Sequence, residues 1–366
     1  MTTIVIAPDS FKGTVGAREA SAAIARGWSS VRGDDELVLR PMADGGEGTL
    51  EAFATATPGA IRMPATVIGP DNHDVHAEWL LLPEGTAVVE LATASGLHLL
   101  DPLLPRDAHT LGFGQLIDAA CDAGATRLVL GIGGSASTDG GVGLLTALGA
   151  AFLDSRGDPI PLGNRGLASL ETVDLSGLRT APAGSIALTD VTNPMLGRRG
   201  AAQVFGPQKG AAQSDLEELD VNLTRLADVL DLRSLAAESG TGAAGGAGFA
   251  LEVWGVALAA GARTVGELVG LPAALKSAQL VITGEGRYDD QTASGKVAHY
   301  VVSLADASRV PAALVAGEID ARTDAFRDVV SLASLAGSTS SARSDAEHWL
   351  VEAGAQLARG FVSRPS

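Results

Sequence analysis

Five short apolar runs, each ending in a turn that carries a carboxylate, constrain the fold of this chain more than any other feature. The runs are rich in Val, Ile and Leu, and their length suits buried strands better than helices. Helical segments follow the first two runs, which gives the βαβα order of a parallel sheet. The runs are TIVIA (3–7), ELVLR (36–40), RLVLGI (127–132), SIALT (185–189) and QLVIT (279–283).

The pattern of apolar runs and turn residues changes between residues 60 and 92. This segment predicts hairpin strands, because its apolar stretches are joined by the turn sequences GPDNHD and PEGT. The alternation of strand and helix returns from about residue 279. Similar texture at both ends of the chain predicts one α/β domain interrupted by an inserted second domain.

Composition limits the possible partners and compartment. A net charge of −17 argues against nucleic acid and anionic membranes as partners. The single cysteine, Cys121, excludes an internal disulfide framework and favours a reducing compartment. The N-terminal apolar run follows no basic segment, and the longest apolar stretch (248–262) carries Glu252. These features predict a soluble, cytoplasmic protein without a signal peptide or membrane span.

The turns that end the five runs gather carboxylates, most of them beside glycine. In a parallel sheet the carboxyl ends of the strands border the ligand crevice, where helix N-termini offer free N–H groups to anions. Mg²⁺ is usually held by one or two carboxylates plus substrate phosphates, so the pattern predicts phosphoryl transfer. The turns are PDSFKG (8–13), DGGEG (44–48), GGSASTDGG (133–141), DVTNP (190–194) and GEGRYDDQT (284–292).

Lysine usage points the same way. The chain has only four lysines, and Lys12, Lys209 and Lys296 each adjoin a glycine. A compact ammonium beside backbone that can approach an anion closely favours phosphate binding. The alternative is coincidence in a chain with 46 glycines.

Other nucleotide motifs are weak or absent. The segment SGKVA (294–298) lacks the first glycine and the Ser/Thr of a P-loop. GTGAAG (240–245) has no strand before it, and GIGGSA (131–136) follows a strand but lacks the third glycine of a dinucleotide site. Beyond His73 and His76 in a predicted turn, the histidines show no metal-ligand spacing, and the position of Cys121 among alanines indicates packing. A dinucleotide-dependent oxidoreductase therefore remains open as an alternative.

Five long segments resemble the signature segments of the bacterial glycerate kinase family, in the family's order. The resemblance implies ATP- and Mg²⁺-dependent phosphorylation of D-glycerate to 2-phosphoglycerate, with 3-phosphoglycerate as the other product. The segments are APDSFKGT (7–14), PMADGGEGT (41–49), GIGGSASTDGG (131–141), TDVTNPMLGRRGAAQVFGPQKGA (189–211) and TGEGRYDDQTASGK (283–296).

The same resemblance implies a fold. A Rossmann-like or flavodoxin-like parallel-sheet domain, residues 1–65 plus 272–366, is interrupted by an inserted mixed α/β domain, residues 66–271, with the active site in the cleft between them. The chain departs from the family at Ser137 and Thr138, where Thr and Asn are usual, and at Ala298 and Tyr300, where proline and glycine are usual. The protein is expected to be a monomer or a homodimer.

Candidate roles follow from side-chain chemistry. Asp190 is predicted to accept the proton of the glycerate hydroxyl, with a structural turn before Pro194 as the alternative. Lys12 is predicted to neutralise the transferring phosphoryl group or the glycerate carboxylate. Asp44, supported by Glu47, and Asp139 are the predicted metal ligands. The other predicted substrate- or phosphate-binding residues are Asp9, Ser10, Gly45, Gly46, Gly133, Gly134, Ser135, Asn193, Lys209, Gly284, Glu285, Gly286, Arg287, Asp289 and Lys296.

Two further alternatives stay open. A kinase for another small hydroxy acid or sugar acid, such as a tetronate, would need the same site chemistry. A non-catalytic binding protein fits less well, because five carboxylate-bearing turns do not help to bind an anion.

Overall fold

The computed structural model describes residues 2–289 and 297–361. The chain forms two compact units. Unit 1 comprises Met1–Asp44, Glu51–Pro58 and Gly261–Ser366, and unit 2 comprises Gly45–Leu50 and Gly59–Ala260. The sequence places the first change of domain between residues 65 and 66, a position that lies inside strand β3 (Ile61–Ile68).

Unit 1 is built on a five-stranded sheet in the order β13-β12-β11-β1-β2, in which every neighbouring pair is parallel. Strand β1 lies in the centre, with Ile4 beside Leu280 of β11 on one side and Leu37 of β2 on the other. The predicted parallel sheet is thus confirmed. Its strands are β1 (Thr3–Ile6), β2 (Glu36–Leu39), β11 (Leu280–Tyr288), β12 (Ala312–Ile319) and β13 (Asp328–Ser331).

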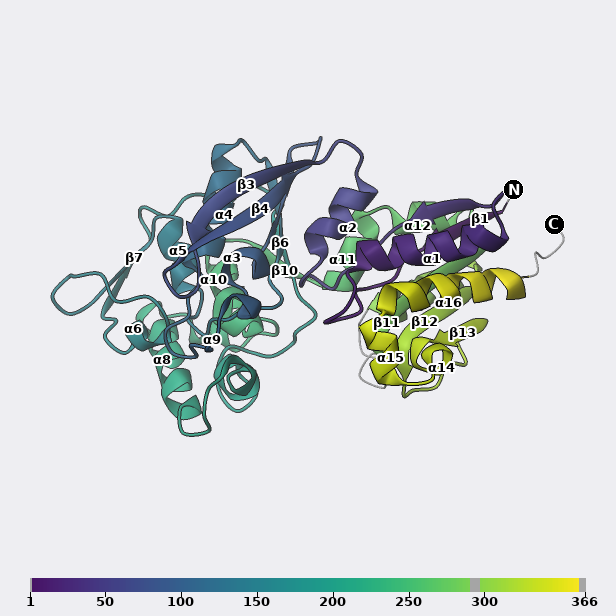
Figure 1. Cartoon of the computed structure of the whole chain (residues 1–366). Coiled ribbons are helices and arrows are strands. Elements are labelled where there is room, and N and C mark those ends of the chain that lie inside the picture. The colour runs from purple at the N-terminus through teal and green to yellow at the C-terminus, as the bar shows by residue number, and fades with distance from the viewer. Residues whose placement is uncertain (1, 290–296, 362–366) are drawn as a thin grey trace. The chain divides into compact units, whose positions relative to one another are not determined.

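Helices from both ends of the chain lie side by side in unit 1. Figure 1 shows α1 in purple alongside α16 in yellow. A Cβ at Gly27 of α1 would lie 1.9 Å from the carbonyl oxygen of Val351 in α16, so only glycine allows this close approach. The helices are α1 (Ala17–Val31), α2 (Thr49–Ala56), α11 (Gly261–Leu268), α12 (Leu271–Leu275), α13 (Val297–Ser308), α14 (Leu332–Ala336), α15 (Thr339–Ser344) and α16 (Ala346–Gly360). The first two residues of α2 belong to unit 2.

Unit 2 holds a mixed six-stranded sheet in the order β10-β9-β6-β5-β4-β3. Strands β3, β4 and β5 are antiparallel neighbours, which confirms the predicted hairpins, whereas β5, β6, β9 and β10 run parallel. The carboxyl ends of these four strands therefore share one edge. The strands are β3, β4 (Asp74–Leu81), β5 (Thr86–Glu90), β6 (Arg127–Gly131), β9 (Ile186–Leu188) and β10 (Ala257–Ala259), with a separate pair β7 (Ala151–Leu153) and β8 (Thr172–Asp174).

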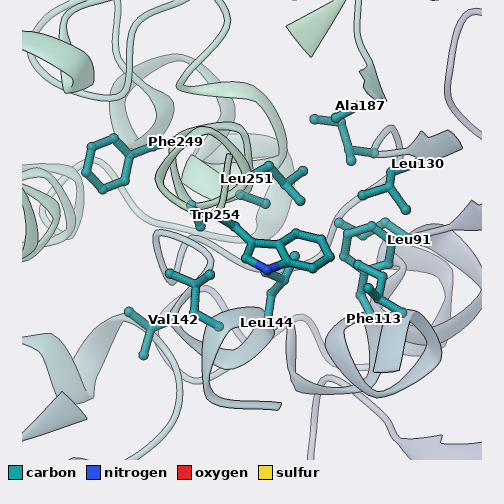
Figure 2. Packing of buried hydrophobic residues seen from close by; sticks show 14 of the residues in the cluster. Leu91, Phe113, Leu130, Val142, Leu144, Ala187, Phe249, Leu251 and Trp254 are labelled. Atoms are coloured by element: carbon teal, nitrogen blue, oxygen red, sulfur yellow. The ribbon is translucent and has the colours of Figure 1, made fainter. Parts of the chain in front are cut away.

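The core of unit 2 is apolar and packed between sheet and helices (Figure 2). Phe113, Leu130, Leu144 and Leu251 are fully buried there, around the indole of Trp254. The helices of unit 2 are α3 (Ala92–Ser95), α4 (Leu111–Asp122), α5 (Val142–Ala147), α6 (Asn164–Leu167), α7 (Ala201–Phe205), α8 (Leu216–Val229), α9 (Arg233–Ala236) and α10 (Ala247–Val253), with 3₁₀ turns η1 (Leu97–Leu99), η2 (Pro207–Lys209) and η3 (Ala243–Gly246).

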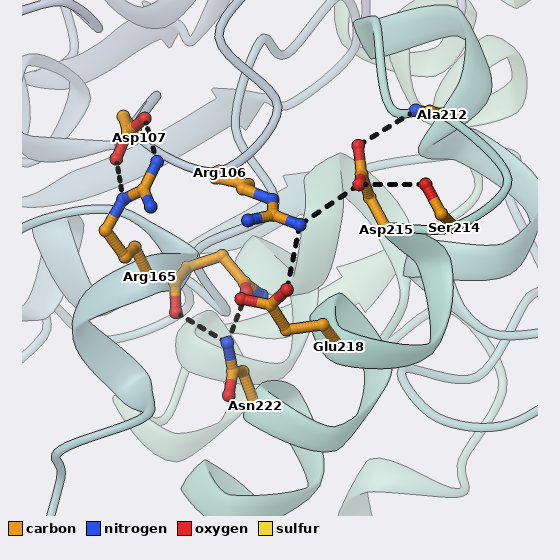
Figure 3. A network of polar contacts seen from close by, with 9 residues as sticks. Arg106, Asp107, Arg165, Ala212, Ser214, Asp215, Glu218 and Asn222 are labelled. Carbon is orange, nitrogen blue, oxygen red and sulfur yellow. Dashed lines mark hydrogen bonds and ion pairs between the residues drawn. The ribbon is translucent and has the colours of Figure 1, made fainter.

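A polar network fixes the start of α8 to neighbouring loops in unit 2 (Figure 3). Arg106 pairs with Asp215 at 3.0 Å and with Glu218 at 2.8 Å. Asn222 donates to the side-chain oxygen of Asn164 at 2.9 Å, and Asn164 donates in turn to the carbonyl oxygen of Thr138 at 2.9 Å. Through the bond from Asn164 to Thr138, the network holds the glycine-rich loop 133–141 in place.

Candidate active site

In unit 1 the loop after β1 is held by backbone bonds to its neighbours. Asp9 N–H donates to the carbonyl oxygen of Gly284 at 2.8 Å, and the Thr283 hydroxyl donates to Ala7 at 3.0 Å. Met42 N–H donates to Pro8 at 2.9 Å. The loops that follow β1 and β2 are therefore fixed to each other and to β11 at the carboxyl edge of the sheet. Strand β11 extends to Tyr288, so residues 284–288, which the sequence predicts as the start of a turn, belong to the strand.

A pocket of about 290 Å³ opens at this edge. Its position matches the general location of ligand sites in parallel α/β sheets. Eight predicted site residues line the pocket together: Asp9, Ser10, Lys12, Asp44, Glu285, Gly286, Arg287 and Asp289. Gly284 lies just outside this set, and a Cβ there would come within 2.2 Å of the carbonyl oxygen of Val315 in β12.

Two carboxylates, those of Asp9 and Asp44, line this pocket together. Burial, and next to it the charge of Asp44, raises the pKa of Asp9 from its ordinary 3.8 to about 7. The Ser10 N–H donates to Asp9 at 2.6 Å and partly offsets the shift. The site thus favours a proton on Asp9 or a cation beside it.

The rim of the pocket carries positive groups. Arg287 pairs with Asp320 at 2.8 Å, and both side chains are largely exposed. The Lys12 side chain is exposed on the loop after β1. Such an arrangement allows anionic ligands to reach the carboxylate pair without facing unrelieved negative charge.

In unit 2 the predicted glycines bring two loops into backbone contact. Gly133 N–H donates to the carbonyl oxygen of Gly45 at 3.0 Å, and a Cβ at Gly133 would lie 2.5 Å from the Cα of Gly46. A Cβ at Gly45 would lie 2.6 Å from Leu188 at the end of β9. These glycines therefore let loop 45–48 lie across the carboxyl ends of β6 and β9. Gly134 has a φ of 75°, which favours glycine at that turn.

Asp139 is fully buried, and its carboxylate accepts four hydrogen bonds. The donors are the N–H and hydroxyl of Thr110, at 2.9 and 2.8 Å, and the N–H groups of Gly141 and Gly143, at 3.1 and 3.2 Å. The carboxylate thus satisfies free donors at the start of α5. Asp139 therefore has a structural role at the start of α5, and its role as a metal ligand stays a prediction.

Lys209 is buried in η2 and binds the glycine-rich loop. Its Nζ donates to the hydroxyl of Ser135 at 2.8 Å and to the carbonyl oxygen of Ser137 at 2.5 Å. Burial lowers the pKa of Lys209 to about 7, with the Asp139 charge acting in the opposite direction. Lys209 therefore positions Ser135, whose hydroxyl proton remains available to a ligand.

Asp190 and Asn193 follow β9. Asp190 is exposed, two residues past the end of the strand. Asn193 donates from its side chain to the carbonyl oxygen of Arg199 at 2.8 Å and accepts from Gly242 N–H at 3.0 Å through its backbone. Asn193 thus shapes the loop that presents Asp190.

Comparison with known proteins assigns the family. A sequence profile of the glycerate kinase family matches residues 4–362. The chain is 44% identical over 331 residues to the glycerate kinase of Bacillus subtilis (strain 168), which covers 88% of this chain and 86% of that protein. This chain belongs to the glycerate kinase family. It is also 42% identical to the glycerate 2-kinase of Escherichia coli (strain K12), with 86% of this chain and 85% of that protein covered.

A solved structure agrees with this family assignment. The crystal structure of a Salmonella typhimurium LT2 protein described as a glycerate kinase 2 superposes with a TM-score of 0.85 at 38% identity, over 98% of each chain. The predicted two-domain α/β class and the predicted family are therefore both confirmed.

The sequence did not single out the part of the glycerate kinase pocket that comes from the C-terminal elements. Besides Phe11 and Thr14 from the loop after β1, the other lining residues are Gly317, Glu318, Leu332, Thr339, Ala342, Arg343 and Ala346. The spacing of Thr339, Ala342 and Arg343 places them on one face of α15, a signal readable from the sequence once that helix is assigned.

Glu90 at the end of β5 is a second residue that sequence reasoning missed. It is 3% exposed and accepts from the N–H groups of Leu50 at 3.1 Å and Gly48 at 3.3 Å. A carboxylate at the end of a buried strand is the sequence signal that could have indicated a residue that binds backbone N–H groups of a neighbouring loop. Glu90 thereby holds the DGGEG loop, whose Glu47 is exposed.

The pocket offers two carboxylates, Asp9 and Asp44, as ligands for a metal ion. Within residues 2–289 and 297–361, the structure shows no group of three or more His, Cys, Asp or Glu side chains that could hold a metal ion. Asp9 and Asp44 fit Mg²⁺ all the same, since Mg²⁺ needs only one or two carboxylates when phosphates supply further oxygens. Lys296 lies outside the described residues. None of the helices that the structure describes has the length and apolar character to cross a membrane.

Proposed function

We propose that this protein transfers the terminal phosphoryl group of ATP to the 2-hydroxyl of D-glycerate, with Mg²⁺. The family assignment supports a glycerate kinase, and the name of the Escherichia coli relative supports the 2-position. One observation carries the proposal furthest. The carboxylate pair Asp9 and Asp44 shares a pocket with Lys12, at the edge where parallel sheets bind ligands.

Asp9 and Asp44 would hold the metal. Burial, and next to it the charge of Asp44, raises the pKa of Asp9 to about 7, and a divalent cation bound by both carboxylates would relieve this cost. When bound, Mg²⁺ neutralises charge on the phosphate oxygens and aligns them. The oxygens of both side chains are hard ligands of the kind that Mg²⁺ prefers.

Lys12 would act on the phosphate itself. Its ammonium lies on the loop after β1, in the lining of the same pocket, and is not buried. A positive charge there stabilises the negative charge that develops on the transferring group. Lys12 would thus bind the phosphoryl group in the transition state more strongly than in the ground state.

Asp190 would accept the proton of the attacking hydroxyl. An exposed carboxylate on a short loop after a strand can reach a substrate hydroxyl and then release the proton to water. Lys209 would contribute indirectly, because it fixes the Ser135 hydroxyl through a 2.8 Å hydrogen bond. Ser135 would then donate to the glycerate carboxylate.

The proposal is tested by ADP formation from ATP with a panel of acceptors. D-glycerate should give the highest kcat/KM, above L-glycerate and four-carbon tetronates. Turnover of a tetronate in preference to D-glycerate would make the protein a kinase of that sugar acid, with the same phosphoryl-transfer chemistry. Oxidation of D-glycerate with NAD⁺, without ADP formation from ATP, would instead refute the kinase proposal.

A further inference from the structure

The unit 1 pocket has two chemically different walls. One wall carries the charged residues already described, together with Phe11 and Thr14, and comes from the loops after β1 and β2 and from the end of β11. The other wall comes from β12 and from α14, α15 and the start of α16. Its apolar members are Leu332, Ala342 and Ala346, which are at most 8% exposed.

The apolar side chains of this second wall, Leu332, Ala342 and Ala346, are unsuited to glycerate, and we call this part of the pocket the apolar wall. Glycerate is a small hydroxy acid in which every carbon bears oxygen, so it gains little from contact with Leu and Ala side chains. A purine ring is flat and largely apolar and gains from such contact. The pocket volume of about 290 Å³ also exceeds what glycerate alone would fill.

Arg343 joins the two walls. It lies one residue from Ala342, and a Cβ built at Gly13 would lie 3.6 Å from its Nη2, so its guanidinium lies close to the Lys12 loop. Its side chain is exposed, and within residues 2–289 and 297–361 it forms no ion pair. A guanidinium in this position suits phosphate oxygens, which it can bind with two parallel hydrogen bonds.

We propose that this pocket is the nucleoside phosphate site of the protein, with the base against Leu332, Ala342 and Ala346. The phosphates extend toward Lys12 and Arg343. Glu318, which lines the pocket at the end of β12, accepts hydrogen bonds from the ribose hydroxyls. The inference rests on the proposed use of ATP and adds which unit and which wall recognise the nucleotide.

The test is calorimetric binding of ADP and of tripolyphosphate to the full chain with Mg²⁺, in the absence of glycerate. Ala342→Leu fills the apolar wall and should weaken ADP binding about tenfold or more while tripolyphosphate binding changes by less than about twofold. Arg343→Gln should weaken both ligands by roughly tenfold. Arg359→Gln is the matched control, since Arg359 is exposed on α16 outside the pocket lining and should leave both affinities unchanged.

The inference is overturned if Arg343→Gln and Arg359→Gln bind ADP equally well. It is also overturned if Ala342→Leu retains full ADP affinity and instead raises KM for D-glycerate. Should Ala342→Leu fail to fold, the comparison of the two arginine variants still decides. Wild-type protein whose ADP binding depends on Arg343, but which leaves D-glycerate unphosphorylated, would support this site while refuting the proposed function.

Discussion

At the scale of single residues, the burial of Asp9, together with the charge of Asp44, makes stability depend on pH. The folded protein keeps a proton on Asp9 up to about pH 7, whereas the unfolded chain releases it near 3.8. Because the folded-state pKa is the higher one, the stability that Asp9 contributes is present at low pH and is lost as pH rises toward 7. A pKa difference of one unit corresponds to about 1.4 kcal/mol.

Asp9→Asn should therefore be more stable than wild type at pH 8 without divalent cations, and the advantage should shrink at pH 5. Thermal unfolding at both pH values measures this difference. Addition of Mg²⁺ at pH 8 should raise the melting temperature of wild type more than that of Asp9→Asn. An equal stability difference at pH 5 and pH 8 would contradict the raised pKa of Asp9.

Asp190→Asn should reduce kcat by roughly 10²- to 10⁴-fold, the usual contribution of a general base. Its melting temperature should stay near that of wild type, because Asp190 is exposed and the change conserves shape. Asp231→Asn is the matched control, as Asp231 is also exposed in unit 2 but is not a predicted site residue. Wild-type turnover in Asp190→Asn would exclude Asp190 as the proton acceptor.

Residue types alone could predict which side chains gather in the unit 1 pocket, because the carboxyl ends of the strands in a parallel sheet lie at the same edge. They could not predict what each side chain does there. Asp139 looks like Asp44 in sequence, since both adjoin two glycines, yet Asp139 is buried and accepts four hydrogen bonds. The difference depends on Thr110, which is distant in the sequence and close in space.

At the scale of secondary-structure elements, the contact between α1 and α16 depends on Gly27. Gly27→Ala would place a methyl group 1.9 Å from the carbonyl oxygen of Val351. The helices must then separate, and we expect a loss of about 1–3 kcal/mol in the free energy of unfolding despite the better helix propensity of alanine. Urea unfolding measures the change. Gly360→Ala in α16, where nothing lies within 4 Å of the added Cβ, should not destabilise the protein.

The start of α2 depends on a carboxylate from another element, Glu90 of β5. Glu90→Gln replaces one acceptor oxygen by an amide donor that faces a backbone N–H, so the loop 45–48 should lose its fixed position. We expect a loss of about 1–3 kcal/mol in stability, together with a lower kcat/KM. Glu84→Gln, an exposed change in the turn before β5, is the control. Unchanged stability and kcat/KM in Glu90→Gln would contradict this positioning role.

At the scale of the whole molecule, the sequence could predict two α/β units, because apolar runs and turn composition reveal strand order without tertiary information. It could not predict that Gly45–Leu50 belongs to unit 2 while Asp44 belongs to unit 1. That division depends on backbone contacts of Gly45 and Gly46 with Gly133 and Leu188, which have no signature in local sequence. One motif thus contributes residues to both units.

The proposed reaction is Mg²⁺-dependent phosphorylation of D-glycerate at the 2-hydroxyl. Phosphorus NMR of the product formed from ATP and D-glycerate, with Mg²⁺ and with EDTA in its place, tests both the position and the metal requirement. We expect a single 2-phosphoglycerate signal that requires Mg²⁺. The proposed reaction is wrong if the correctly folded protein forms no phosphoglycerate with Mg²⁺, or forms it equally well in EDTA.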